Sequence, residues 1–377
     1  MTQSWIAFCG KTPPLSKLEL VRQLPHFGGF DSIISLTVDS LQIKSKMPSA
    51  DVLNRFGGLI RASLVLGQVP RAELVNFLLD VITNDALIGR DIGLSCTSDM
   101  SGRDLTRLGL DLKKRLKALH KLIRIVLPNT ETMLSTVVVQ KQIMDKGGVE
   151  FCLIENRGQW IISRTTWVHA YSDWSEREFG KPDVDVKRGL LPQKLARMMV
   201  NISGLDLNKD VTIIDPFCGS GVVLQEAREL GCTILGSDVD PVAVRATKHN
   251  LGLAESDGHI KVADARTVQY SRVDAQKVAI VCEPWLGPVW NSRPSPAELD
   301  RTIGEISALY LMALAHWKTF LPTGAPVVMV FPVIFGQSVF QKTVDNIVRL
   351  KYSSSTSPIR YEREHQMVTR DIVVLSA

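Results

Sequence analysis

Apolar and polar positions in the second half of the chain alternate in the order of a repeating strand–helix unit. Short apolar runs such as VTIID, TILGSDV and KVAIVCE are separated by stretches in which apolar residues recur every three or four positions. The short runs are typical of buried strands, and the longer spacing is typical of amphipathic helices. Residues 191–377 are therefore predicted to form an α/β domain, a doubly wound sheet with helices on both faces.

The first half of the chain has a different texture and no glycine-rich nucleotide loop. Strands are predicted at WIAFCG, SIISLTV, DIGLSCT, LIRIVL, STVVVQK and EFCLIEN, and helices at 16–23, 49–56, 71–82 and 105–119. This order favours small α+β modules, which we divide into a ferredoxin-like module at 1–60 and a second module at 61–164. Residues 165–190, rich in charged and aromatic side chains, are predicted to be a linker.

Composition narrows the possible classes of protein. The chain has 377 residues, of which 45% are hydrophobic and 22% are charged, and this suits two or three folded domains. No apolar run approaches the roughly 20 residues that span a bilayer, and the N-terminus lacks a secretion signal. The six cysteines are scattered without metal-ligand spacing, which favours free thiols and no metal site. We therefore expect a cytoplasmic protein without a membrane segment.

A glycine-rich loop follows the first strand of the α/β half. The strand VTIID runs into PFCGSG and then into a helix, so the backbone of residues 215–221 can approach a ligand at a helix N-terminus. The loop lacks the GK[ST] of a phosphate-binding P-loop and the three glycines of the dinucleotide fingerprint. A tight strand-to-helix turn would by itself explain these glycines, so the loop needs support from its neighbours.

Acidic residues at the ends of the next two strands supply that support. Asp238 ends the second strand, where a carboxylate can hold both hydroxyls of a ribose, and Asp264 ends the third, where a carboxylate can accept from an adenine amino group. Asp240 is predicted to cap the next helix, with Pro241 at its first position. Together with the loop, Asp238 and Asp264 predict a nucleotide-type site.

The series DPFCGSG, GSDVD, ADA and a strand ending in an acid–proline pair resembles the class I S-adenosylmethionine-dependent methyltransferases that modify amino nitrogens. More narrowly, FGKPDVDVKRGLLPQKLARMMVNISG resembles the segment upstream of the donor loop in the tRNA guanine-N2 methyltransferases that carry an N-terminal THUMP domain. The matching stretch runs from about Trp167 to Asp264, and pieces of the first half resemble the same family less specifically.

The resemblance implies strand order 3-2-1-4-5-7-6, S-adenosylmethionine as the methyl donor, tRNA as the partner and a THUMP-like RNA-binding domain at 61–164. By position, it places these residues at the donor: Asp215, Pro216, Phe217, Cys218, Gly219, Gly221, Asp238, Val239, Asp264, Ala265 and, upstream of the loop, Leu191 and Pro192. The sequence leaves open the oligomeric state and the small activating subunit that some relatives use.

The stretch CEPWLGP ends the fourth strand, where the resemblance implies the acceptor amine. Amino-nitrogen methyltransferases usually have Asp or Asn, two prolines and an aromatic residue at this point. Oxygen atoms that accept both N–H bonds turn the amine lone pair toward the methyl group, and the aromatic ring stacks on the base. Here Glu283 adds one methylene, Pro284 is retained and Trp285 stands one position early. We expect these three residues to form the acceptor site, with the loop adjusted to the longer side chain.

Basic residues gather in DLKKRLKALHKLIR. They are Lys113, Lys114, Arg115, Lys117, Lys121 and Arg124, and they are predicted to lie opposite Leu112, Leu116, Leu119 and Leu122 on an amphipathic helix. Such a face is often only solvated, but a face of one sign also fits phosphate contacts. Lys181 and Arg188 belong to a second group of mixed charge. The net charge of +5 permits a polyanionic partner, and we predict that both groups contact RNA.

Three functions remain open at this point. The leading prediction is a methyltransferase that modifies the exocyclic amine of a tRNA guanosine. The alternatives are an amino-methyltransferase that acts on another RNA or on adenine or cytosine in DNA, and a noncatalytic RNA-binding protein that retains the fold. Near the C-terminus, YEREHQMVTRDIVVL is predicted to form a β-hairpin in which His365 and Arg370 occupy structural or surface positions.

Overall fold

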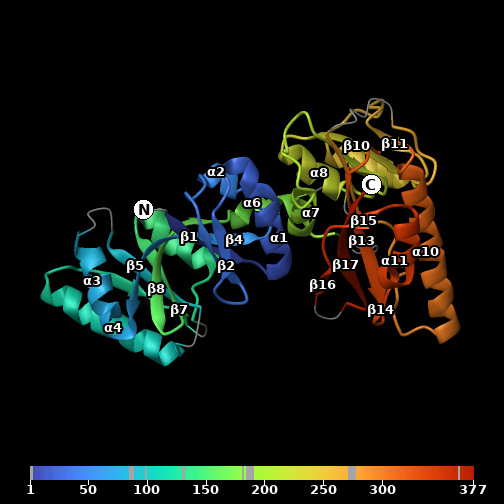
Figure 1. The fold of residues 1–377 in the computed structure, drawn as a ribbon. Coiled ribbons are helices and arrows are strands. Elements are labelled where there is room, and N and C mark those ends of the chain that lie inside the picture. The colour runs from blue at the N-terminus through green and yellow to red at the C-terminus, as the bar shows by residue number, and fades with distance from the viewer. Residues whose placement is uncertain are drawn as a thin grey trace. The chain divides into compact units, whose positions relative to one another are not determined.

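The computed structural model describes residues 3–84, 89–97, 100–129, 132–180, 182–183, 191–270, 277–363 and 366–377, without the side chains of 173, 178 and 179. The chain forms two compact units, each built on its own sheet (Figure 1). The first unit comprises Met1–Lys17, Leu24–Asn54 and Gly58–Ser172, and the second comprises Leu18–Gln23, Arg55–Gly57 and Asp173–Ala377. Among the described residues, no helix has the length and apolar content needed to span a bilayer.

The first unit contains a mixed sheet in the order β2-β3-β1-β4-β8-β7-β5-β6. Its strands are β1 (Ser4–Cys9), β2 (Ser32–Ser35), β3 (Ser40–Lys44), β4 (Leu59–Pro70), β5 (Asp91–Cys96), β6 (Arg124–Val126), β7 (Val149–Asn156) and β8 (Gln159–Val168). Its helical segments are α1 (Pro13–Gln23, of which Leu18–Gln23 is counted with the second unit), η1 (Leu24–Phe27), α2 (Ala50–Leu53), η2 (Arg71–Glu73), α3 (Leu74–Asn84), α4 (Gly102–Ala118), α5 (Thr136–Val138), η3 (Val139–Ile143) and η4 (Met144–Lys146). The boundary expected at residue 60 falls within β4, so the sheet continues across it.

The strand predicted at STVVVQK is wrong, because these residues begin the helical stretch from α5 to η4. Ser135 caps this stretch by accepting a hydrogen bond from the Val138 N–H. Val139 and Ile143, one helical turn apart, are both fully buried against Leu134. Packing of these apolar side chains therefore outweighs the β-propensity of the Thr-Val-Val-Val run.

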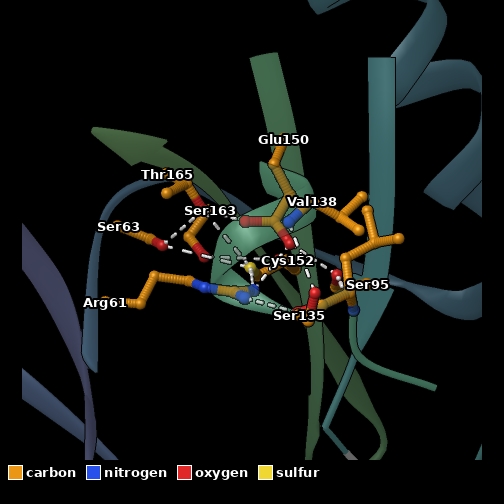
Figure 2. Close-up of polar contacts among 10 residues, drawn as sticks. Arg61, Ser63, Ser95, Ser135, Val138, Glu150, Cys152, Ser163 and Thr165 are labelled. Carbon is orange, nitrogen blue, oxygen red and sulfur yellow. Dashed lines mark hydrogen bonds and ion pairs between the residues drawn. The ribbon is translucent and has the colours of Figure 1, made fainter. Parts of the chain in front are cut away.

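A buried polar cluster ties four strands of the first unit together, as Figure 2 shows. Arg61 on β4 donates from Nη1 to Glu150 Oε1 on β7 at 2.6 Å, and neither side chain is more than 2% exposed. Ser95 on β5 donates to Glu150 Oε1 at 2.5 Å, and Thr165 on β8 donates to Oε2 at 2.6 Å. Both carboxylate oxygens are thus satisfied, as a buried charge requires. Burial also raises the pKa of the neighbouring Cys152 thiol to about 12.

The second unit contains the sheet β11-β10-β9-β12-β13-β17-β15. Its strands are β9 (Thr212–Asp215), β10 (Thr233–Asp238), β11 (Ile260–Val262), β12 (Val278–Cys282), β13 (Pro326–Ile334), β14 (Gln337–Ser338), β15 (Ser353–Ser354), β16 (Ile359–Tyr361) and β17 (Val368–Ser376). Its helices are α6 (Tyr171–Phe179), α7 (Gln193–Asn201), α8 (Val222–Glu229), α9 (Pro241–Asn250), α10 (Pro296–Trp317) and α11 (Val339–Arg349). The seven strands of the main path have the order 3-2-1-4-5-7-6, so the predicted class I methyltransferase topology is confirmed.

Helices cover both faces of this sheet. On one face, Ile214, Ile280 and Cys282 belong to a core cluster completed by Tyr310 and Trp317 of α10. The alternate residues of the same strands, such as Ile213, are equally buried on the other face. Strands that are apolar on both sides are typical of parallel sheets enclosed by helices. The polar groups that remain gather where β9, β10 and β12 end.

Candidate active site

A cavity of about 1090 Å³ opens at the carboxyl ends of the central strands of the second unit. Its lining includes residues predicted for the donor and for the acceptor: Leu191, Pro216, Phe217, Cys218, Gly219, Asp238, Val239, Asp264, Ala265, Glu283, Pro284 and Trp285. Among the described residues predicted for the donor, Asp215, Gly221 and Pro192 are not in this lining. The fold therefore brings the ends of four strands to one open cavity.

Asp215, the last residue of β9, fixes the conformation of the loop that follows this strand. This carboxylate is 2% exposed, and its Oδ1 accepts a hydrogen bond from the Phe217 N–H at 3.0 Å. Burial raises the pKa of Asp215 well above its ordinary value, and the nearby charges of Asp238 and Glu283 raise it further. Asp215 therefore shapes the loop rather than facing the cavity.

Left-handed backbone at two glycines allows the loop to turn into α8. Gly219 has φ +52° and Gly221 has φ +86°, and a Cβ added to Gly221 would lie 2.9 Å from a side-chain carbon of Thr247. The Thr247 hydroxyl donates to the Gly219 carbonyl at 2.7 Å. Gly221 thus serves the turn and its close packing against α9, while Gly219 lines the cavity.

Asp238 connects the loop to the end of β10. Its Oδ2 accepts from the Gly219 N–H at 2.9 Å, and its Oδ1 accepts from the Asp240 N–H at 3.0 Å. Asp240 caps α9 by accepting from the Val242 N–H, as predicted. Each Asp238 oxygen keeps a second lone pair, so the carboxylate can still accept from two vicinal hydroxyls in the cavity.

Asp264 has a partner that the motif did not indicate. Arg266 donates to Asp264 from Nε at 2.9 Å and from Nη2 at 2.5 Å, and this hydrogen bonding lowers the pKa of Asp264. Ala265 is fixed by a hydrogen bond of 3.0 Å from the indole of Trp317 to its carbonyl. Both Asp264 and Arg266 line the cavity, so a ligand amine at this point would share the carboxylate with the guanidinium.

The residues after β12 also have identifiable supports. The Arg370 Nε donates to Glu283 Oε1 at 2.5 Å, with side chains 5% and 13% exposed. The Trp285 carbonyl accepts from the Tyr310 hydroxyl at 2.9 Å, while its side chain is 44% exposed. This arrangement holds a carboxylate and presents an aromatic ring at the cavity. The expectation that Arg370 occupies a structural or surface position missed its contact with Glu283.

These residues fit S-adenosylmethionine. Asp238 and Asp264 follow neighbouring parallel strands and line the same cavity, and the negative charge of Asp238 suits a sulfonium cation. Val239 and Val242 are 71% and 59% exposed at the cavity and offer an apolar surface to a planar base. Among the described residues, no group of three or more His, Cys, Asp and Glu side chains could hold a metal ion.

Two relatives of known name match part of the chain. The chain is 39% identical over 100 residues to a tRNA (guanine(10)-N2)-dimethyltransferase of Methanothermobacter thermautotrophicus, covering 26% of this chain and 28% of that protein. It is 31% identical over 119 residues to a probable tRNA (guanine(10)-N2)-dimethyltransferase of Methanothermococcus thermolithotrophicus, covering 30% of this chain and 72% of that protein. The chain belongs to the tRNA guanine-N2 methyltransferase family.

Other similarities of this family member agree with its fold. Residues 183–313, which include the loop and Glu283, match the RMKL-like methyltransferase domain of UPF0020. The structure of TrmN from Thermus thermophilus superposes with a TM-score of 0.58 over 99% of this chain and all of that one, at 14% identity. The matched stretch spans less than a third of the length of the Methanothermobacter relative.

In this methyltransferase family member, the predicted basic helix is shorter than expected. α4 ends at Ala118, so Lys121 lies beyond it and Arg124 belongs to β6. Leu112 and Leu116 are buried as predicted, but Leu119 and Leu122 are 54% and 78% exposed, because the helix no longer directs them toward the core.

Two of the predicted RNA-binding arginines are already paired. Arg115 is paired with Asp111 at 3.1 Å, and Arg124 is paired with Asp91 at 2.8 Å. Of the described residues predicted to contact RNA, four are exposed and make no ion pair: Lys113, Lys114, Lys117 and Lys121. Lys181 and Arg188 lie outside the described residues.

Proposed function

We propose that this chain is an S-adenosylmethionine-dependent tRNA methyltransferase that adds a methyl group to the exocyclic N2 of a guanosine. The observation that carries the proposal is the shared cavity, lined by the glycine loop, Asp238, Asp264 and the stretch Glu283–Trp285. Support for the substrate comes from the relatives named tRNA (guanine(10)-N2)-dimethyltransferase. The fold alone accommodates many acceptors, so the site and these relatives together carry the substrate.

One half of the cavity binds and orients the methyl donor. S-adenosylmethionine supplies an electrophilic methyl group when it is bound. Asp238 accepts from the ribose hydroxyls, Asp264 and Ala265 face the adenine, and the exposed valines pack against its ring. Leu191, which lines the cavity, completes the donor side, with Pro192 next to it at the start of α7, and Asp215 holds the loop in its conformation.

The acceptor half turns a weak nucleophile toward the donor. The lone pair of a guanine amine is delocalised into the ring, so the amine must be oriented before it can attack. Glu283 accepts a hydrogen bond from the amine and takes the proton released as the nitrogen–carbon bond forms. The half-exposed Trp285 ring stacks on the base. It replaces the neighbouring bases on which the target base stacked before it left the RNA helix.

The first unit binds the RNA in this proposal. The unpaired lysines of α4 and its C-terminal turn present positive charge, which suits the phosphate backbone. Residues 61–164, with the end of β8 up to Val168, act as a THUMP-like domain, and residues 1–60 act as a ferredoxin-like part of the same sheet. The remainder of the stretch predicted as a linker at 165–190 connects this domain to the second unit. The described cysteines are buried and not joined in disulfides, which agrees with function in the cytoplasm.

A transfer assay tests the proposal. The full chain is incubated with methyl-labelled S-adenosylmethionine and, in separate reactions, with total tRNA, total rRNA and double-stranded DNA. The proposal expects label in tRNA, lost by about 100-fold in Glu283→Ala because the amine is no longer oriented. Label in rRNA or DNA alone would support the other amino-methyltransferases. If the chain binds RNA but neither binds the methyl donor nor transfers a methyl group, the result would support a noncatalytic RNA-binding protein.

A further inference from the structure

The ion pair between Arg370 and Glu283 explains how a longer carboxylate side chain can be held at an acceptor site. Glu283 follows β12, and Arg370 lies on β17, two strands away across β13. Only one carboxylate oxygen, Oε1, is bound by the guanidinium. Within the described ranges, no residue donates a hydrogen bond to Oε2, and Glu283 lines the cavity. The pair therefore fixes one oxygen and leaves the other available to a ligand.

The surroundings of the pair make it a positioning device rather than a surface contact. Both side chains are largely buried, so the pair is little weakened by solvent, in contrast to exposed ion pairs. The strand that carries Arg370 is held in register by nine residue pairs with β13, among them Pro332 with Arg370. A guanidinium on such a strand has little freedom, and it restricts the extra torsion that a glutamate has relative to an aspartate.

The pair also matters for charge. Asp215, Asp238 and Glu283 lie close enough for the charges of the other two to raise the pKa of Asp215. A guanidinium carries only N–H donors, so the Glu283 oxygen that it binds serves as a hydrogen-bond acceptor.

We propose that Arg370 is a positioning residue of the acceptor site, which holds Glu283 by Oε1 so that Oε2 accepts the N–H of the substrate amine. This inference rests on the proposed methyl transfer and deepens it. Arg370 itself does not touch the substrate. Its effect on the reaction passes through Glu283, and this distinguishes it from a residue that only stabilises the fold.

The test compares kcat, the KM for tRNA and the donor Kd in the full chain and its variants. Arg370→Met removes the cation at similar length, and we expect kcat to fall about 10- to 100-fold, as for a misplaced reacting group, with donor Kd and tRNA KM changed less than about threefold. Arg370→Lys restores the charge without the fork and should recover part of kcat. In Glu283→Ala, adding Arg370→Met should change kcat less than about twofold, because the group that Arg370 positions is absent.

A control comes from Arg360 on the adjacent strand β16, whose partner Asp371 is the residue next to Arg370 on β17. Arg360 pairs with Asp371 at 2.6 Å, and neither residue lines the cavity among the described residues. Arg360→Met should leave kcat unchanged. If Arg370→Met fails to bind the donor, Arg370→Lys decides alone, with a lowered kcat at unchanged donor Kd. An unchanged kcat in the folded Arg370 variants, or equal losses with and without the Glu283 carboxylate, would overturn the inference. Absence of transfer by the unaltered chain would instead overturn the proposed function.

Discussion

Asp238 accepts a hydrogen bond from the backbone N–H of Gly219 at 2.9 Å, and this bond joins the end of β10 to the glycine loop after β9. The same carboxylate faces the cavity. One side chain thus shapes the glycine loop and presents acceptor oxygens to the cavity in which we propose that the methyl donor binds. Replacement of Asp238 is expected to affect binding of the donor before it affects the stability of the unit.

Asp238→Ala should weaken S-adenosylmethionine binding by at least about 100-fold, equivalent to about 2.7 kcal/mol, because the ribose hydroxyls lose their acceptor and the loop loses its support. Isothermal titration calorimetry on the full chain measures this Kd. Asp210→Asn is the control, because Asp210 is 61% exposed and is absent from the cavity lining. Donor affinity retained in Asp238→Ala would remove Asp238 from the donor site.

The buried Asp215 gives a pH-dependent prediction. Its folded-state pKa is raised, so above the unfolded pKa of about 3.9 the unfolded chain releases a proton that the folded chain retains. The stability contribution of Asp215 therefore falls as pH rises from about 4 toward the folded pKa. Asp215→Asn keeps an acceptor for the Phe217 N–H but has no group that titrates. As pH rises from about 4 to 7, its melting temperature should rise relative to that of the unaltered chain, by about 2–4 °C for each kcal/mol of stability that Asp215 loses. An equal difference at both pH values would contradict this assignment.

The cluster around Glu150 predicts a large stability effect in the first unit. Glu150→Leu leaves the Arg61 guanidinium buried without its partner and should destabilise the unit by about 3–5 kcal/mol. The double variant Arg61→Met/Glu150→Leu should lose much less, because no charge then remains buried. Urea unfolding followed by circular dichroism measures both. If the double variant is as unstable as Glu150→Leu, the pair stabilises the unit by more than the neutralisation of its two buried charges.

The lysines of the first unit predict salt-dependent RNA binding. Reversal of Lys113, Lys114 and Lys117 to Glu should weaken tRNA binding by at least about tenfold and reduce the slope of log K against log salt by about 2–3. The control is reversal of the exposed Lys11, Lys44 and Lys46, of which Lys44 ends β3 and the other two follow β1 and β3 by two residues. Filter binding at several salt concentrations gives both quantities. If both triple variants lose tRNA affinity equally, the effect depends on the net charge of the chain and not on a specific RNA-binding face.

The strand ends were predictable from the sequence because their signals are local. The run from VTIID to the glycine loop, and the acids that follow the next two strands, each fall within one strand–helix unit. Parallel topology then brings their carboxyl ends to one edge, so Asp238, Asp264 and Glu283 were expected together before their geometry was known.

The partners of these residues were not predictable, because their signals are not local. Arg370 reaches Glu283 across 87 positions of sequence, through the register of β17 on β13. The long strands β4 and β8 carry polar residues at buried positions: Arg61, Ser63, Ser163 and Thr165. These residues interrupt the apolar pattern by which a strand is recognised, so the two strands were not predicted. Those side chains are satisfied only by the cluster around Glu150, which depends on the complete sheet.

The most direct test of the central claim is the identity of the methylated nucleoside. tRNA is methylated by the full chain with deuterated-methyl S-adenosylmethionine, digested to nucleosides and analysed by mass spectrometry, with Glu283→Ala as the reference. The account predicts the label in N2-methylguanosine or N2,N2-dimethylguanosine, and at least about 100-fold less of it with Glu283→Ala. Label on adenosine or cytidine, or label on guanosine that is unchanged in Glu283→Ala, would contradict it.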